Sequence, residues 1–362
     1  MSYFLPSLIA CFCLGWPSYL ALRRCGVVDK PNARSSHSVP TVRGGGIAII
    51  LVVLGAITLE AIRPVGSDGP LLAIALAVLL LAVISFIDDL RSVRALLRFG
   101  VHGAAAATVL VIVGVPDFGL AGGAALALAM LWVAIGFLWI AGYTNAFNFM
   151  DGINGIAGGQ TAVTGLATAA LALVAGLDAT HPAVWLAAAT AGAAAGFLPY
   201  NFPRARMFMG DVSSAPLGFL LAALGWWLVR DTAWWMIIPM GLLHANFVLD
   251  TGITLVRRLL RGERWYQPHR EHFYQRLVRA GRSHAEVTSA EMALLLLGAI
   301  SVVLAVKSGS GLGLTVVAVA IPAGWGLFFL RAERIFRRSK IAQSERGKTT
   351  STSVKSCDDI PV

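Results

Sequence analysis

The chain has 362 residues, of which 57% are apolar and only 13% are charged, about half the charged share of a soluble globular protein. This composition excludes a water-soluble domain as the bulk of the molecule. The net charge of +10 would suggest nucleic acid in a soluble protein, but a membrane protein collects Lys and Arg in its cytoplasmic loops.

We predict an all-α, polytopic membrane protein with about eleven transmembrane helices, because eleven stretches approach the roughly 20 apolar residues that span a bilayer. The expected helices occupy residues 3–22, 46–62, 70–87, 96–114, 123–141, 156–176, 183–199, 213–229, 233–255, 288–306 and 311–330. A multi-span catalytic domain is predicted for residues 1–331. Residues 332–362, which are Ser, Thr and Lys-rich after about 338, are predicted to be a disordered cytoplasmic tail.

The basic residues are distributed very unevenly between the two sides of these helices. With eleven spans, 26 of the 29 Lys and Arg residues fall on one side, and only Arg63, Arg230 and Lys307 fall on the other. The richer side is predicted to be cytoplasmic, which places the N-terminus outside and the C-terminus inside. The positive charge therefore requires no nucleic acid.

Acidic residues gather at the ends of predicted helices. Asp88 and Asp89 end span 70–87, Asp151 lies between spans 123–141 and 156–176, and Asp211 precedes span 213–229. Helix parity places all of them on the cytoplasmic side. An Asp pair at a helix end is often only a solvated cap, but it can also bind Mg²⁺, which takes oxygen ligands.

Two further motifs carry residues that a membrane helix does not require. Asn145, Asn148, Asp151 and Asn154 lie within NAFNFMDGINGIAGG, which is either a polar re-entrant turn or a site where backbone N–H groups meet a phosphate. Phe208, three residues before Asp211, is either an interfacial aromatic or a stacking platform for a base.

The segment from His269 to Arg276 reads either as an amphipathic interfacial helix or as a phosphate-recognition segment. Its candidate ligands are His269, Arg270 and His272, and a zinc site is not expected because no Cys lies nearby. No chemistry is assigned to the isolated His37, His102, His181, His244 and His284.

In combination these motifs are more specific. The order FIDD, NxxNxxDGxNG, FMGD and PHREH, preceded by DKPNARSSHSVPTVRGGG, resembles the polyprenyl-phosphate sugar-1-phosphate transferases, glycosyltransferase family 4. The resemblance covers about residues 20–285. His269-Arg-Glu-His272 stands where the lipid I branch carries consecutive histidines, and it is similar to the N-acetylhexosamine branch related to O-antigen initiation.

The resemblance implies transfer of a sugar 1-phosphate from a UDP-N-acetylhexosamine, or a deoxy derivative, to undecaprenyl phosphate in a bacterial inner membrane, with release of UMP. It implies that Asp211 and Asp151 hold Mg²⁺ or Mn²⁺, and that Asp88 and Asp89 act on the lipid phosphate. Nucleotide or sugar contacts are implied for Asn145, Asn148, Asn154, Asn201, Phe208, His269, Arg270 and His272. The pathway would be O-antigen, lipopolysaccharide or other surface-polysaccharide synthesis.

The alternatives are a transporter or flippase and a non-catalytic scaffold. Transporters place ionisable groups near the bilayer midplane, and His244 and Asp250 within span 233–255 are the residues that fit this reading. Asp250 is also expected to pair with Arg257 or Arg258. The oligomeric state is open, with a homodimer as one option.

Overall fold

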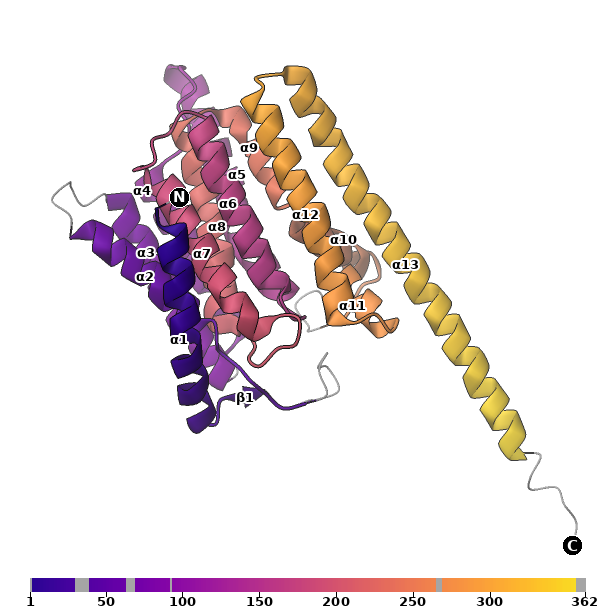
Figure 1. Cartoon of the computed structure of the whole chain (residues 1–362). Helices are drawn as coiled ribbons and strands as arrows, with labels where there is room; N and C mark the ends of the chain where they lie inside the picture. Colours follow the sequence, from indigo (N-terminus) through magenta and orange to yellow (C-terminus); the bar gives the residue numbers. More distant parts are fainter. Residues whose placement is uncertain (1, 30–38, 63–68, 92, 265–268, 356–362) are drawn as a thin grey trace, which may run out of the picture.

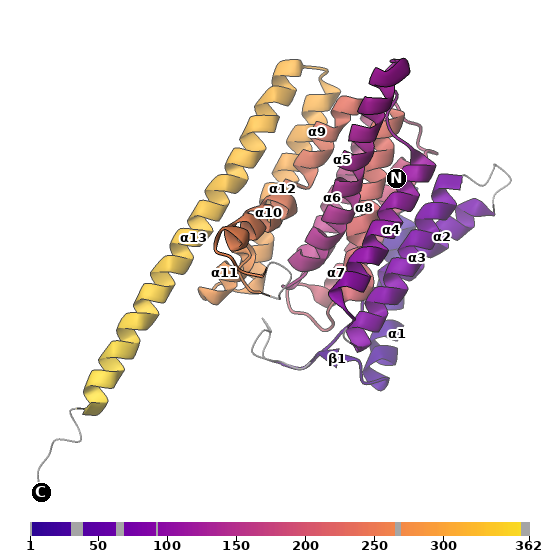
Figure 2. The same ribbon diagram turned by 180° about the vertical axis from the view of Figure 1, so that it is seen from behind.

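A computed structural model describes residues 2–29, 39–62, 69–91, 93–264 and 269–355, with side chains described as far as residue 342. Figure 1 shows the helices packed side by side into a bundle, and Figure 2 shows the same arrangement from behind. The helices are α1 Phe4–Arg24, α2 Ile47–Ala61, α3 Gly69–Leu90, α4 Ala95–Val113, α5 Gly122–Met150, α6 Ile156–Val174, α7 Pro182–Asn201, α8 Asp211–Asp231, η1 Trp234–Met236, α9 Ile237–Leu243, α10 Ala245–Leu260, α11 Phe273–Arg279, α12 His284–Lys307 and α13 Gly311–Lys355.

The all-helical membrane fold is confirmed, but the number of spans differs from eleven. Within the described residues nine helices are long and apolar enough to cross a membrane, or ten if the bent pair at residues 234–260 counts as one span. The remaining predicted span is α2, whose 15 residues are short for a bilayer. Two short strands, β1 Val28–Asp29 and β2 Thr41–Val42, pair antiparallel and were not predicted.

Helix α8 lies at the centre of the bundle. Every residue from Val212 to Val229 is buried, and α2 to α7 contact this helix. On the outer side of α7, Gly192 and Gly196 let α1 approach closely, since an added Cβ would lie 2.1 Å from the Phe4 carbonyl oxygen and 2.2 Å from that of Leu8. Small residues four apart allow this backbone contact within a membrane. The bundle therefore fixes the N-terminus of α8, where Asp211 lies.

The predicted span 233–255 is not one straight helix, because the chain bends by 79° between α9 and α10 at His244. Asn246, Asp250, Thr254 and Arg258 recur every four residues on α10 and are all buried, while Leu260 is 84% exposed. The polar stripe turns one face of α10 inward. The sequence signal for this amphipathic helix was present, although we interpreted the segment as an apolar span.

Helix α13 continues to Lys355, through residues for which the sequence predicted disorder. Figure 1 shows that it extends well beyond the end of the bundle at which α11 lies. Residues 332–355 are helical in the structure, whereas the division at residue 331 and the cytoplasmic tail after it stay predictions.

Candidate functional site

Asp89 holds the N-terminus of α8. Its Oδ1 and Oδ2 accept hydrogen bonds from the backbone N–H groups of Asp211 at 3.1 Å and Val212 at 3.0 Å, and its side chain is fully buried. Gly210, at φ +80°, allows the close approach, since a Cβ there would lie 2.8 Å from Asp89 Oδ2. A carboxylate at a helix N-terminus satisfies unpaired amides and the positive end of the helix dipole. Asp89 thus positions Asp211.

Two arginines flank Asp211. Arg43, directly after β2, places Nε 2.8 Å from Asp89 Oδ1 and Nη2 3.2 Å from Asp211 Oδ1. Burial opposes the charge of Arg43, but Asp211, Asp89 and Asp29 outweigh it and raise the pKa of its guanidinium. Arg98, on α4, pairs with Asp88 and lies 3.7 Å from Asp211 Oδ2. Asp211 is therefore a carboxylate between two fixed cations.

Both carboxylate oxygens of Asp88 have hydrogen-bond partners. Its Oδ1 accepts from the backbone N–H of Val93 at 2.7 Å, and its Oδ2 pairs with Arg98. The adjacent carboxylates of Asp88 and Asp89 therefore point to different partners, which excludes a shared role as two ligands of one cation in this arrangement.

Asp151 differs from the other carboxylates because it has no hydrogen-bond or ion-pair partner in the described part of the chain. It follows the last residue of α5. Burial, then the charge of Asp211 and with a smaller effect that of Asp89, raise the pKa of Asp151 to about 7, although Arg43 opposes the shift. An unpaired carboxylate close to a second carboxylate is a site that a cation would stabilise.

These two carboxylates fit Mg²⁺ only in part. Among the described residues, no group of three or more His, Cys, Asp and Glu side chains could hold a metal ion. Mg²⁺ is commonly bound by one or two carboxylates together with substrate phosphates and water. Asp211 and Asp151 therefore form a candidate half-site that a diphosphate would complete.

A polar pocket opens beside Asp211, between α3, α4, α5 and α8. It is lined by Ser85, Asp88, Arg98, Phe99, His102, Asn145, Asn148, Phe149, Asp211 and Ala215. His102 Nδ1 lies 3.0 Å from Asn145 Oδ1, and Asn148 Nδ2 donates to Ser214 Oγ at 2.8 Å. The last two turns of α5 carry both asparagines, so they do not lie in a loop after residue 141 as the sequence predicted.

Three residues of this pocket region were missed from the sequence. Arg43 and Arg98 were counted only as loop charges, and His102 was set aside as isolated. The GGG run after Arg43 was the available signal, because Gly45 and Gly46 donate their backbone N–H groups to the carbonyls of Phe208 and Met209. This pairing brings the first loop to the start of α8.

Asn154, Asn201 and Phe208 are held by internal contacts. Asn201 Oδ1 accepts from Gly155 N at 2.7 Å, and its Nδ2 donates to the Met207 carbonyl at 3.0 Å. Asn154 Nδ2 donates to the Pro203 carbonyl, and its Oδ1 lies 3.1 Å from His284 Nδ1. The backbone N–H of Phe208 donates to the Val42 carbonyl. The polar atoms of Asn201 thus tie loops together, and the nucleotide or sugar contacts implied for Asn201 and Phe208 stay a prediction.

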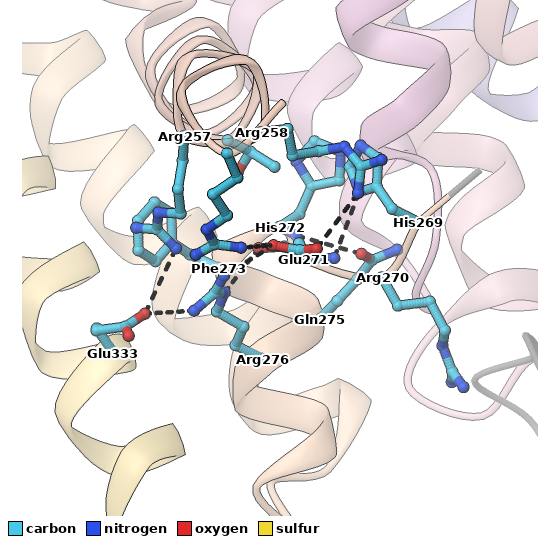
Figure 3. Close-up of polar contacts among 12 residues, drawn as sticks. Arg257, Arg258, His269, Arg270, Glu271, His272, Phe273, Gln275, Arg276 and Glu333 are labelled. Atoms are coloured by element: carbon cyan, nitrogen blue, oxygen red, sulfur yellow. Dashed lines mark hydrogen bonds and ion pairs between the residues drawn. The ribbon is translucent and has the colours of Figure 1, made fainter. Parts of the chain in front are cut away.

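The segment around His272 forms a second polar cluster, shown in Figure 3. His272 Nδ1 lies 3.0 Å from Asp250 Oδ1, and both oxygens of Asp250 accept from Phe273 N. Asp250 caps α11 here, so its expected pairing with Arg257 or Arg258 is wrong. His272 is buried within this capping contact, whereas His269 is about half-buried.

Glu271 forms ion pairs with three arginines of this cluster. It pairs with Arg261 at 3.0 Å, and with Arg258 and Arg276 at 3.3 Å each. Burial, then the neighbouring His272 and Arg258 charges, lower the pKa of His269 to about 4, so its ring is neutral at pH 7. His269 and Arg270 remain the candidates for contact with a ligand.

The two clusters lie at the same end of the bundle and touch through α11. Tyr274 donates its hydroxyl hydrogen to the Phe149 carbonyl at 3.1 Å, next to Asp151. Gly152 allows this contact, because an added Cβ would lie 2.1 Å from the Tyr274 hydroxyl oxygen. The structure places the acidic residues at one end of the bundle, as helix parity predicted, while the side of the membrane stays a prediction. Residues 30–38 of the first loop motif and residues 265–268, which include the first residue of the PHREH motif, lie outside the described residues.

Comparison with known proteins gives consistent matches. Residues 71–229 match a family described as glycosyl transferase family 4. The chain is 31% identical to decaprenyl-phosphate N-acetylglucosaminephosphotransferase of Mycolicibacterium smegmatis, over 77% of the chain and 75% of that relative. It is 30% identical to a probable undecaprenyl-phosphate N-acetylglucosaminyl 1-phosphate transferase of Bacillus subtilis, over 72% of each. A phospho-N-acetylmuramoyl-pentapeptide-transferase of Heliobacterium modesticaldum is 33% identical over 62% of the chain and 70% of the relative.

Proposed function

Since the chain belongs to glycosyl transferase family 4, we propose that it transfers N-acetylhexosamine 1-phosphate from a UDP-sugar to a polyprenyl phosphate. The observation that carries this proposal is the unpaired carboxylate of Asp151 near Asp211, which is itself flanked by Arg43 and Arg98. Phosphoryl transfer depends mainly on positioning and on neutralising charge, and this site provides both.

The lipid phosphate is proposed to occupy the pocket of Arg98, His102 and Asn145. A lipid-facing groove of about 630 Å³ runs along the same two helices, α4 and α5, from Ala107 to Val111 and from Met130 to Leu138. An apolar groove farther along the two helices that line a cationic pocket suits an amphiphile with a phosphate head and an isoprenoid tail. Undecaprenyl phosphate is the proposed lipid, by resemblance.

In the proposed reaction an oxygen of the lipid phosphate attacks the β-phosphorus of the donor. The bond from the β-phosphorus to the bridging oxygen breaks, UMP leaves, and a polyprenyl-diphosphate-sugar forms. Asp211 and Asp151 would hold Mg²⁺, which supplies positive charge to the diphosphate when bound. Arg43 and Arg98 orient Asp211 and neutralise negative charge, and His269 and Arg270 are proposed to contact the sugar or diphosphate.

The separate partners of Asp88 and of Asp89 support direct attack by the lipid phosphate. Asp89 accepts two backbone N–H groups, and Asp88 is held by Arg98 and Val93 N, so neither carboxylate is presented as a nucleophile. We assign positioning roles to both, in place of the catalytic roles implied by resemblance.

The biological setting is a bacterial inner membrane with the site on the cytoplasmic face, and the product would initiate O-antigen or another surface polysaccharide. The charge asymmetry supports this orientation. The transporter alternative receives no support from the relatives, which are named as transferases. Purified protein supplied with UDP-N-acetylglucosamine, undecaprenyl phosphate and Mg²⁺ should release UMP only when the lipid is present.

A further inference from the structure

The cytoplasmic part of α13 packs directly on α11. Phe273 of α11 stacks on Phe329 of α13 with ring centroids 4.5 Å apart, and Ala332 and Phe336 are buried on the same helix face. The guanidinium groups of Arg276 and Arg279 lie over the Phe336 ring at 5.4 and 5.0 Å. A helix far along the chain thus contacts the helix that follows His269 and His272.

Arg276 joins the two helices through its charge. Its Nη1 donates to Glu333 Oε2 at 2.6 Å, its Nε donates to the Glu271 carbonyl at 2.8 Å, and its Nη2 lies 3.3 Å from Glu271 Oε2. Only 5% of Arg276 is exposed. Figure 3 shows Arg276 and Arg257 both directed toward Glu333, and the Arg257 contact measures 3.6 Å.

Resting on the proposed function, we propose that Glu333 is a positioning residue for the sugar-nucleotide donor, because it holds Arg276 and thereby the His269–His272 segment in its binding geometry. Glu333 touches no candidate substrate group itself. Helix α13 therefore contributes to the geometry of the donor site.

Charge balance explains why this second carboxylate matters. Glu271 pairs with Arg258, Arg261 and Arg276, and Glu263 also pairs with Arg258 and Arg261. Among the described carboxylates, Arg276 pairs only with Glu271 and Glu333. Without Glu333, the buried guanidinium of Arg276 would retain only Glu271, and Arg257 would lose its carboxylate. Removing one partner of a buried ion pair leaves an uncompensated charge, whereas removing a partner from an exposed pair costs little.

The second oxygen of Glu333 makes an exposed contact that offers a matched control. This oxygen, Oε1, accepts from Arg337 Nε at 2.8 Å, and Arg337 is 75% exposed. Glu333→Gln removes the charge that holds Arg276, while Arg337→Gln removes only the exposed contact. Glu333→Asp keeps the charge and shortens the side chain, which should give an intermediate result.

The experiment combines kinetics with hydrogen exchange on the purified full chain. For Glu333→Gln we expect KM for UDP-N-acetylglucosamine to rise about tenfold with kcat changed less than threefold, and the amides of α11 to exchange faster. Arg337→Gln should leave both measurements within about twofold of the unaltered protein. Equal KM and equal α11 exchange for Glu333→Gln and Arg337→Gln would overturn the inference.

The proposed function can fail separately. If the unaltered protein released no UMP, the reaction assignment would fall, but faster α11 exchange in Glu333→Gln would still establish the contact between α11 and α13. If the unaltered protein turned over and Glu333→Gln matched it in KM, only the role of Glu333 would fall.

Discussion

The Asp89 carboxylate accepts the backbone N–H of Asp211 at 3.1 Å, so one acidic residue of the site orients the helix that presents another. These residues lie on α3 and α8 and are separated by 122 positions in the chain. A second example occurs between Asp250 on α10 and Phe273 at the start of α11. In both places a buried carboxylate caps a helix that carries or follows the candidate ligands.

The first prediction concerns this cap. Asp89→Ala should destabilise the protein by about 1–2 kcal/mol, because it leaves two α8 amides without their acceptor and leaves Arg43 paired only with Asp211. Activity should fall as well, since Asp211 loses its support. Thermal unfolding in detergent measures the first effect, with Asp117→Ala, an exposed loop carboxylate, as the control. An unchanged unfolding temperature would show that Asp89 does not act as a cap.

The second prediction separates Asp211 from Asp89. Asp211→Asn keeps the backbone of α8 and should remain folded, but its transfer rate should drop by about 10²–10³-fold, as is typical when one electrostatic group is lost. Adding excess chelator to the unaltered protein should abolish turnover. Full turnover of Asp211→Asn, or activity in chelator, would remove Asp211 from the metal site.

The third prediction uses the raised pKa of Asp151. Its folded-state value of about 7 exceeds its ordinary value of 3.8, so its contribution to stability is fully present below pH about 4 and is lost as pH rises through 7. Asp151→Asn should therefore unfold at a higher temperature than the unaltered protein at pH 8, with a smaller difference at pH 5. Mg²⁺ should stabilise the unaltered protein at pH 8 more than the variant. A variant less stable at pH 8 without metal would contradict an unpaired, half-buried carboxylate at this position.

The fourth prediction concerns the donor. His269-Arg-Glu-His272 leads us to expect UDP-N-acetylglucosamine or a related N-acetylhexosamine donor. A single pocket contact shifts discrimination by only about 1–3 kcal/mol, so several such sugars should react. Competition among UDP-N-acetylglucosamine, UDP-N-acetylfucosamine, UDP-N-acetylquinovosamine and UDP-N-acetylmuramyl pentapeptide, scored by kcat/KM, tests this. Clear preference for the muramyl donor would move the chain to the lipid I branch without changing the reaction type.

The fifth prediction is the orientation. Reporter fusions after residue 205 and after residue 335 should both read as cytoplasmic, because the Lys and Arg residues collect on that side. A fusion after 65 should read as external. An external signal at 205 would place the site on the opposite face of the membrane.

The sequence was sufficient for the helical membrane fold and for the acidic motifs, because apolar length and rare carboxylates are local signals. The sequence could not show which residues each carboxylate contacts. Nothing in the run SFIDDL distinguishes Asp88, which meets Arg98, from Asp89, which caps α8, since both contacts depend on packing between distant helices. Likewise Asn201 and Phe208 were grouped as ligands, yet Asn201 uses both polar atoms to join two loops.

The polar face of α10 and the carboxylate of Glu333 on α13 show the same limit of prediction from sequence. The four-residue spacing of Asn246, Asp250, Thr254 and Arg258 was visible, but residues 233–255 were interpreted as one apolar span that ended before Arg258. Glu333 lay in a segment interpreted as a tail, and only the fold brings it to Arg276.

The most direct test of the proposed reaction follows the β-phosphate of the donor. UDP-N-acetylglucosamine labelled with ³²P at the β position is incubated with the purified protein, undecaprenyl phosphate and Mg²⁺, and Asp211→Asn serves as the inactive control. We predict that the label moves into the lipid fraction and that the nucleotide product is unlabelled UMP. Label retained in water-soluble UDP would mean that the sugar moves without its phosphate, and it would contradict the proposed reaction.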